Sequence, residues 1–317
     1  MRPTRTPWPA STVRSNPHRA PSGRFSVGLG PGALLALSAA ALWGFAAVVA
    51  KDVFSAVSPL RVAQTRALAT AVILLAFVGF IARTRPRLPR ETLGLVALFG
   101  AALALVNGSY YLAIRRLPVG VALTIQYLAP LIVLVVRRHR VSRRLWAAAG
   151  CCVIGAALVS GIATGFSGSV TGLLFAAVSA GGFASYLLLG EAVAKKVGAT
   201  ASVAFGFSAA SIVWAVVQPW WSYPFGPLGG WGVGWRMAVV CILGTVVPFC
   251  LMVAAVRKIS AGPAGVLATA EPGFGALFAL MLLGESLTPL QVVGLVLVVA
   301  GVGAVEAAAP VEVDPAR

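Results

Sequence analysis

A carboxylate lies inside an apolar segment near the C-terminus of the chain. Glu271 falls within the run from Gly262 to Leu283, and Pro272 follows it directly. In a bilayer a charge near the midplane costs about 3 kcal/mol on insertion scales, so such a residue faces a protein interior or a wet cavity and marks a pathway. Proline removes a backbone donor, so we expect the helix to bend or open at this acid. Burial disfavours the charged carboxylate, which suits a group that exchanges a proton for substrate.

Other polar and aromatic side chains occupy similar apolar segments. Arg66, for example, lies about 10 Å along its segment from Pro59 at 1.5 Å per residue, so it needs a carbonyl, an acid or water as a partner. Such residues either line a substrate site or only form hydrogen bonds between helices, and Glu271 could be a structural partner of Arg66. The substrate or coupling candidates are Glu271, Gln126, Trp43, Arg66, Asn107, Tyr110, Tyr127 and Tyr186, and the candidate helix breaks are Pro130, Pro248 and Pro272.

The composition places these residues in a membrane protein. The 317 residues are 59% hydrophobic and 10% charged, with a mean hydropathy of +0.92. A spanning helix needs about 20 apolar residues, and ten segments of about this length predict an all-α polytopic membrane protein with ten transmembrane helices. The predicted spans are residues 32–50, 59–82, 92–112, 118–136, 144–162, 170–190, 200–221, 233–256, 262–283 and 288–308. The short connections leave no room for a soluble catalytic domain.

The formal net charge of +17 is distributed unevenly between the two sides of the predicted membrane. If the N-terminus is cytoplasmic, the cytoplasmic tails and loops hold nineteen Lys and Arg residues, and the other side holds only Lys51, Arg115, Arg116 and Arg236. This asymmetry follows the positive-inside rule and predicts that both termini are cytoplasmic. The basic clusters alternate with spans and form no single basic face, so a nucleic-acid partner is not expected. Glu191, beside Lys195 and Lys196, is expected to form a solvated ion pair at the cytoplasmic interface.

An internal repeat divides the chain into two halves. The segment PVGVALTIQYLAP from Pro118 matches PAGVLATAEPGFG from Pro263 at an offset of 145 residues, which places Gln126 on Glu271. Upstream, residues 113–117 match residues 255–259 after a shift of three residues. These matches relate the fourth and ninth spans, so repeats of five spans insert with opposite orientation and place a substrate site near the midplane. The predicted domains are a disordered basic tail (1–31), a first repeat (32–165), a second repeat (166–308) and a short cytoplasmic tail (309–317).

With these motifs, residues 32 to 305 resemble the EamA-type family of the drug/metabolite transporter superfamily. The resemblance implies ten helices in two inverted five-helix repeats, a central cavity and export of small metabolites, often amino acids or toxic compounds. The two halves differ where Arg137-Arg138-His139-Arg140 stands in place of Leu282-Leu283-Gly284-Glu285. The matching residues are Ala41-Leu42-Trp43-Gly44, Ser58-Pro59-Leu60, Arg66, residues 113–117, Thr245-Val246-Val247-Pro248-Phe249, Glu271-Pro272, Leu283-Gly284-Glu285, Gly294 and Gly301.

We therefore expect a secondary transporter that works by alternating access in the inner or plasma membrane, with the bilayer, a small-molecule substrate and protons as partners. A membrane scaffold or a polytopic lipid-modifying enzyme is the alternative, although an enzyme would need a nucleophile, base or metal cluster and the sequence offers only isolated charges. No cofactor is expected, because no Gly-Lys pair is present to build a phosphate-binding loop. His18 and His139 lie far from clustered cysteines or carboxylates, so no metal site is predicted. The pair Gly161 and Gly165 leaves a homodimer open.

Overall fold

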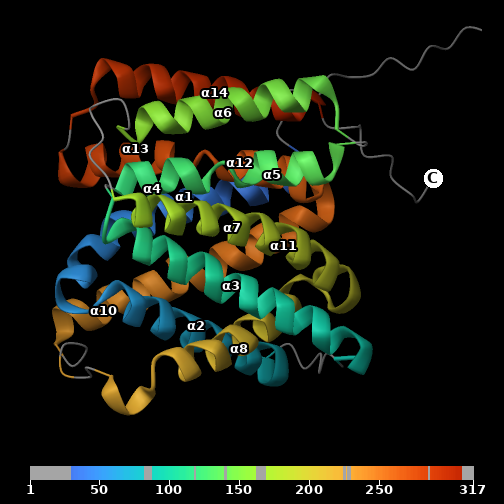
Figure 1. The fold of residues 1–317 in the computed structure, drawn as a ribbon, viewed down its shortest axis with the longest axis vertical. Coiled ribbons are helices and arrows are strands. Elements are labelled where there is room, and N and C mark those ends of the chain that lie inside the picture. Colours follow the sequence, from blue (N-terminus) through green and yellow to red (C-terminus); the bar gives the residue numbers. More distant parts are fainter. Residues whose placement is uncertain are drawn as a thin grey trace, which may run out of the picture.

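Helices make up all the regular secondary structure of the described residues, which in this computed structural model are 30–81, 88–117, 119–138, 141–161, 169–223, 226, 230–284 and 286–308. Figure 1 shows the helices side by side, with α6 and α14 at one edge of the bundle and α2 and α8 at the other. The α-helices are α1 (Pro31–Ala56), α2 (Pro59–Ala76), α3 (Leu93–Ile114), α4 (Val119–Gln126), α5 (Ala129–Val136), α6 (Arg143–Val159), α7 (Val170–Val197), α8 (Ala199–Val217), α10 (Trp231–Cys241), α11 (Val247–Ile259), α12 (Ala261–Ala268), α13 (Glu271–Leu283) and α14 (Pro289–Ala308). Short π-helical or 3-10 segments are η1 (Phe77–Ile81), η2 (Arg90–Thr92), η5 (Trp220–Ser222) and η6 (Ile242–Val246).

The helices have the length and hydropathy of a polytopic membrane protein. In the part of the chain that the structure describes, seven helices are long and apolar enough to cross a membrane, and Val121–Val136 and Pro289–Val305 form shorter apolar helices. The predicted all-helical membrane class is therefore confirmed. The total of ten spans and the cytoplasmic location of both termini stay predictions, and most of the predicted N-terminal tail (1–29), the C-terminal tail and Glu285 lie outside the described residues.

Two predicted spans are interrupted near their centres. The chain leaves α4 at Gln126 and resumes as α5 at Ala129, and it leaves α12 at Ala268 and resumes as α13 at Glu271. Pro130 and Pro272 each occupy the first turn of the second helix, where the missing N–H needs no partner. At each break the backbone hydrogen bonds tighten to a spacing of three residues, from Leu128 to Ile125 in the first span and from Thr269 to Val266 in the second.

The matching boundaries correct the predicted register of the repeat. α4 begins at residue 119 and ends at 126, and its counterpart α12 begins at 261 and ends at 268. α5 begins at 129, and its counterpart α13 begins at 271. The offset is thus 142 residues, the offset at which residues 113–117 match 255–259, and the predicted offset of 145 is wrong at the breaks. Ala129, and not Gln126, occupies the position of Glu271.

The third interruption is a wide turn inside one long helix. α10 continues through the π-helical segment η6 into α11, and Pro248 is in the first turn of α11. A π-helical turn leaves backbone groups out of the regular ladder and is frequent at functional sites. Its carbonyl at Gly244 becomes a partner for a side chain of α2, described below.

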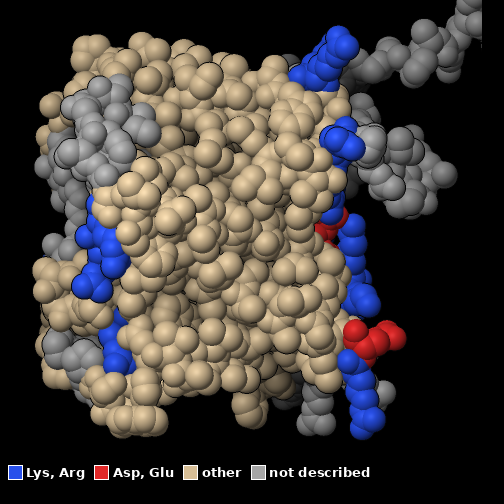
Figure 2. Space-filling view, in the orientation of Figure 1, with Lys and Arg blue, Asp and Glu red and all other residues tan. Residues whose placement is uncertain are grey.

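Charged side chains gather at the two ends of the bundle. Figure 2 shows Lys and Arg along two opposite sides of the molecule, with a band of other residues between them. We call the end where α5, α7 and α11 finish and α12 begins the basic end; Arg137, Lys195, Lys196, Arg257 and Lys258 lie there. α1 also begins at this end, since a Cβ on Gly32 would be 2.5 Å from Ile259 Cγ2. The uncharged band has the character of a surface in contact with lipid.

Glycines bring helix backbones into direct contact. A Cβ on Gly155 of α6 would lie 2.7 Å from the carbonyl oxygen of Gly294 in α14, and a Cβ on Gly294 would lie 2.7 Å from the carbonyl oxygen of Gly155. Small residues permit such close packing of membrane helices. Gly165, the second residue of the pair considered for a homodimer, lies outside the described residues.

Candidate functional site

A cavity of about 100 Å³ lies among the helices at the level of the breaks. A water needs roughly 10–15 Å³ of such space, so the cavity can hold several waters or a small polar molecule. Six of the predicted site residues line it, and they come from both halves of the chain. The lining residues are Trp43, Arg66, Val106, Asn107, Tyr110, Tyr111, Leu123, Gln126, Phe183, Phe249 and Glu271.

Glu271 is held at the first turn of α13 by a helix terminus and a phenol. The unpaired N–H groups at the start of a helix favour a negative charge there, because they form the positive end of the helix dipole. The hydroxyl of Tyr127 donates a hydrogen bond to Glu271 Oε2. Tyr127 is fully buried and lies in the gap between α4 and α5, so one hydrogen bond joins the two helix breaks.

Arg66 is held by three groups other than Glu271. Its Nε donates to Thr245 Oγ1 at 2.6 Å, one terminal nitrogen donates to the carbonyl oxygen of Gly244 at 2.9 Å, and the other donates to the hydroxyl of Tyr111. Within the described ranges no ion pair joins Arg66 to Glu271. A guanidinium carries five N–H groups, so two stay available to a ligand.

Gln126 and Asn107 each use one atom of the side-chain amide, an oxygen and a nitrogen respectively, in a hydrogen bond within the protein. Gln126 Oε1 accepts a hydrogen bond from Ser179 Oγ at 2.8 Å, and Asn107 Nδ2 donates to the carbonyl oxygen of Leu103 at 2.8 Å. In the described part of the chain, the Gln126 amide nitrogen and the Asn107 amide oxygen have no hydrogen-bond partner. The cavity wall therefore offers one further donor and one further acceptor.

Aromatic rings form most of the remaining wall, and Val106 and Leu123 complete it. Trp43 makes edge contacts with Phe249 at 5.3 Å and with Phe183 at 6.4 Å between ring centroids. Tyr186 does not line the cavity: it lies behind this wall, stacked on Phe183 at 5.7 Å and edge-on to Phe249 at 5.2 Å. Of the eight predicted residues, Tyr127 and Tyr186 thus stand one layer outside the cavity.

Sequence reasoning missed several residues of this site. Phe183 and Phe249 line the cavity, and Thr245 and Tyr111 hold Arg66. A phenylalanine in an apolar span carries no signal that separates a cavity wall from ordinary core. Thr245 and Tyr111 were visible as polar residues in membrane segments, which is the signal that could have placed them.

Comparison with known proteins assigns the family. The EamA-like transporter family model matches the chain twice, over residues 30–161 and 170–305. The chain belongs to the EamA-like transporter family. This EamA-like chain is 26% identical over 277 residues to the threonine/homoserine exporter RhtA of Escherichia coli K12, covering 85% of this chain and 89% of that protein. It is 26% identical over 261 residues to the RhtA of Salmonella typhimurium LT2, covering 80% and 84%.

A partial relative and a solved structure are also similar to the chain. The uncharacterized transporter YcbK of Bacillus subtilis is 27% identical over 139 residues, which are 41% of this chain and 43% of that protein. A protein of known crystal structure superposes with a TM-score of 0.71 at 19% identity, covering 86% of this chain and 95% of the other. That superposition bears on the fold alone. The EamA-like chain is a multi-pass plasma-membrane protein.

Proposed function

We propose that this EamA-like transporter exports amino acids or similar small polar metabolites by alternating access. The observation that carries the proposal is the pairing of Glu271 and Arg66 in one cavity, each held by partners of its own. An amino acid carries an ammonium and a carboxylate, which complement these two charges. The relatives named threonine/homoserine exporters support the same substrate class.

The side chains that line the cavity would bind different parts of an amino acid. Arg66 binds the substrate carboxylate through its two available N–H groups, and Glu271 binds the ammonium group or exchanges it for a proton. Gln126 and Asn107 contribute the amide donor and acceptor that a hydroxyl on the substrate would need. Trp43 and Tyr110 pack on the carbon skeleton.

Alternating access requires two halves that can rock against each other. The register of 142 residues and the two family matches support inverted repeats at about residues 32–165 and 166–308, with the cavity between them. In this arrangement the basic end is cytoplasmic, as the positive-inside rule requires. Homology to transporters favours transport over the scaffold and the lipid-modifying enzyme.

The test is transport in proteoliposomes. Purified protein is reconstituted with labelled threonine or homoserine inside, and efflux is followed with and without an imposed pH gradient. Glu271→Gln should abolish gradient-dependent efflux, because the amide keeps the shape and cannot carry the charge or the proton. Glu91→Gln makes the same change at an exposed position in η2 and should match the wild type.

Two results would contradict the proposal. Wild-type efflux by Glu271→Gln would remove Glu271 from coupling, and absence of saturable efflux of either amino acid by the wild type would overturn the substrate class.

A further inference from the structure

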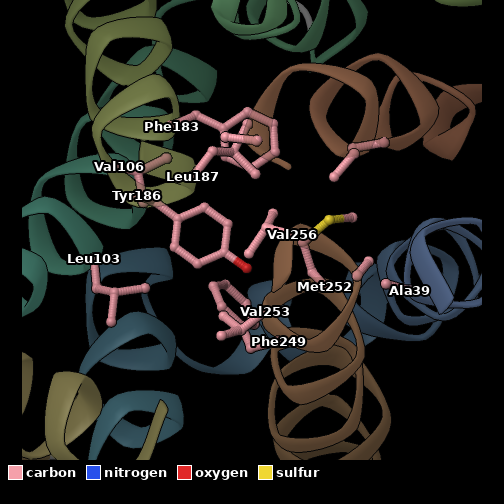
Figure 3. Close-up of a cluster of buried hydrophobic side chains, with 14 of the residues drawn as sticks. Ala39, Leu103, Val106, Phe183, Tyr186, Leu187, Phe249, Met252, Val253 and Val256 are labelled. Atoms are coloured by element: carbon pink, nitrogen blue, oxygen red, sulfur yellow. The ribbon is translucent and has the colours of Figure 1, made fainter. Parts of the chain in front are cut away.

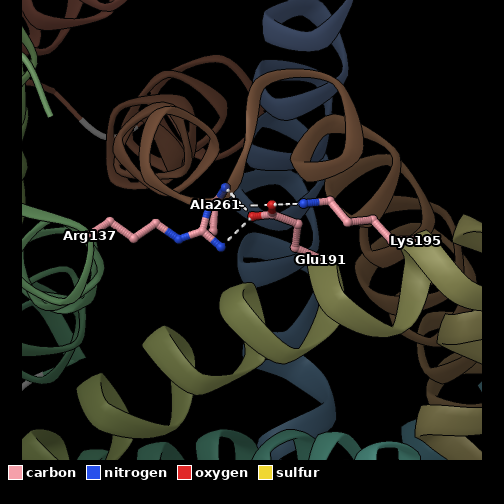
Figure 4. Close-up of polar contacts among 4 residues, drawn as sticks. All are labelled: Arg137, Glu191, Lys195 and Ala261. Atoms are coloured by element: carbon pink, nitrogen blue, oxygen red, sulfur yellow. Dashed lines mark hydrogen bonds and ion pairs between the residues drawn. The ribbon is translucent and has the colours of Figure 1, made fainter. Parts of the chain in front are cut away.

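Glu191 of α7 is a buried carboxylate at the basic end, about 12 Å beyond the cavity residue Phe183 at 1.5 Å per residue. Its side chain is 3% exposed, so the predicted solvated ion pair is wrong. Oε2 pairs with Arg137 at 3.0 Å and accepts the backbone N–H of Ala261 at 2.9 Å, while Oε1 pairs with Lys195 at 2.6 Å. Figure 4 shows these partners converging on one carboxylate.

Two of the three partners of Glu191 lie at the ends of the two interrupted helices, and the third, Lys195, lies on α7 itself. Arg137 directly follows α5, and Ala261 is the first residue of α12. Glu191 therefore joins the basic-end halves of both interrupted helices to α7. A buried ion pair adds little net stability compared with apolar packing, so stability alone does not explain a charged cluster at this position.

The backbone next to this cluster is strained. Ser260, immediately before α12, has φ 67° and ψ 168°, a conformation that is essentially restricted to glycine. Such strain persists only where the surroundings enforce it. Here the hydrogen bond from the next residue, Ala261, to Glu191 fixes the start of α12.

Apolar side chains fill the space between the cavity and Glu191. Figure 3 shows Tyr186 and Leu187 of α7 packed against Met252, Val253 and Val256 of α11. None of these five side chains is more than 2% exposed. The Tyr186 hydroxyl is buried without a hydrogen-bond partner in the described residues, an unfavourable arrangement in a packed layer.

The middle of α12 also rests on this layer. A Cβ on Gly265 of α12 would lie 2.8 Å from Leu187 Cδ1. A movement of α12 therefore changes the packing around Leu187 and Tyr186. Along α7, the apolar layer and then the Glu191 cluster lie between the cavity and the basic end.

We propose that Glu191 is a positioning residue that latches the basic end of the transporter shut by holding Arg137 and the start of α12 together. Release of the latch frees α5 and α12 to move away from α7, which opens the apolar layer and admits substrate from the basic end. The latch rests on the proposed alternating access, but its test needs no substrate.

The test measures access to the apolar layer. Val253→Cys is introduced into a chain whose four native cysteines are replaced by alanine, and its reaction with a membrane-impermeant thiol reagent is timed in vesicles that expose the basic end. Glu191→Gln and Arg137→Gln should each accelerate labelling roughly tenfold, equivalent to about 1.4 kcal/mol in the opening equilibrium. Lys196→Gln removes an exposed positive charge from the same helix end without touching Glu191 and should change nothing.

A second cysteine probe tests whether opening at the basic end is accompanied by closure of the cavity toward the opposite end. Asn107→Cys in the cavity, labelled in vesicles of the other orientation, should react more slowly in the same two variants. Labelling of Val253→Cys at equal rates in Arg137→Gln and Lys196→Gln would overturn the latch. Arg137→Gln decides the matter if Glu191→Gln does not fold, because it keeps the bonds of Glu191 to Lys195 and Ala261. A latch without detectable amino-acid transport would contradict the substrate proposal and leave the latch standing.

Discussion

The hydroxyl of Tyr127 donates to the carboxylate of Glu271, and this contact ties the break of one interrupted helix to the break of the other. The donor comes from the first half of the chain and the acceptor from the second. A cationic group that replaced the Tyr127 hydroxyl at Oε2 would break this contact. Loss of the contact would therefore affect the breaks of both interrupted helices.

Removal of this donor should impair transport more than folding. A hydrogen bond to a charged group contributes about 1.5–3 kcal/mol, so Tyr127→Phe should lower the rate of threonine efflux by roughly tenfold or more. Tyr223→Phe is the matched control: its hydroxyl bonds Thr65 at 2.6 Å, away from the cavity. Equal efflux rates in the two variants would show that the Tyr127 contact is dispensable.

The three contacts of Arg66 require a guanidinium. A lysine has a single nitrogen and cannot reach Thr245, Gly244 and Tyr111 in the same fork geometry. Arg66→Lys should therefore raise the KM for the amino acid and lower the melting temperature, both measured on purified protein. Arg144→Lys, at an exposed position in α6, should leave both values unchanged. An unchanged KM in Arg66→Lys would argue against carboxylate binding by this residue.

Close packing of α1 on the first turn of α13 positions Glu271. A Cβ on Gly44 would lie 2.6 Å from the Gly275 nitrogen and 2.9 Å from the Glu271 carbonyl oxygen. Gly44→Ala should destabilise the protein by about 1–3 kcal/mol and reduce efflux, because α13 must shift. Gly181→Ala has open space around its new methyl group and should be neutral or slightly stabilising in thermal unfolding. Wild-type stability of Gly44→Ala would contradict the packing.

The strained residue before α12 offers a change in the opposite direction. Glycine adopts φ 67° and ψ 168° readily, so Ser260→Gly should relieve part of a strain of about 1–3 kcal/mol and raise the melting temperature. Ser142→Gly, at φ −73° and a helix cap, should be neutral or lower it slightly. A lower melting temperature of Ser260→Gly would contradict backbone strain at Ser260.

Much of the candidate site could be predicted from the sequence, because polar and charged residues stand out in the apolar segments of a membrane protein. An acid followed by proline inside an apolar run singles out Glu271, and Arg66, Gln126 and Asn107 are exceptions of the same kind. The family resemblance rested on short motifs around these positions, and the family match covers the same region. Weak internal identity did not fix the register, since Pro118 and Pro263 favoured an offset that the helix boundaries contradict.

The remaining features depend on contacts between distant parts of the chain. Glu191 looked like a surface ion pair because Lys195 is four residues away, whereas its burial depends on Arg137 and Ala261, 54 and 70 residues away. The place of Phe183 and Phe249 in the cavity wall likewise depends on helices that are far apart in the sequence. Their side chains resemble those of any apolar span until the packing of α7 and α11 is known.

The seam between α6 and α14 has a mechanical consequence. Gly155 and Gly294 bring the two backbones together, and a slide by one residue would drive neighbouring side chains such as Leu158 or Val298 into the opposite backbone. α6 and α14 are therefore held in one register at the edge of the bundle in Figure 1. We therefore expect α6 and α14 to keep their contact during transport, so that the proposed alternating access would move the inner helices that surround the cavity.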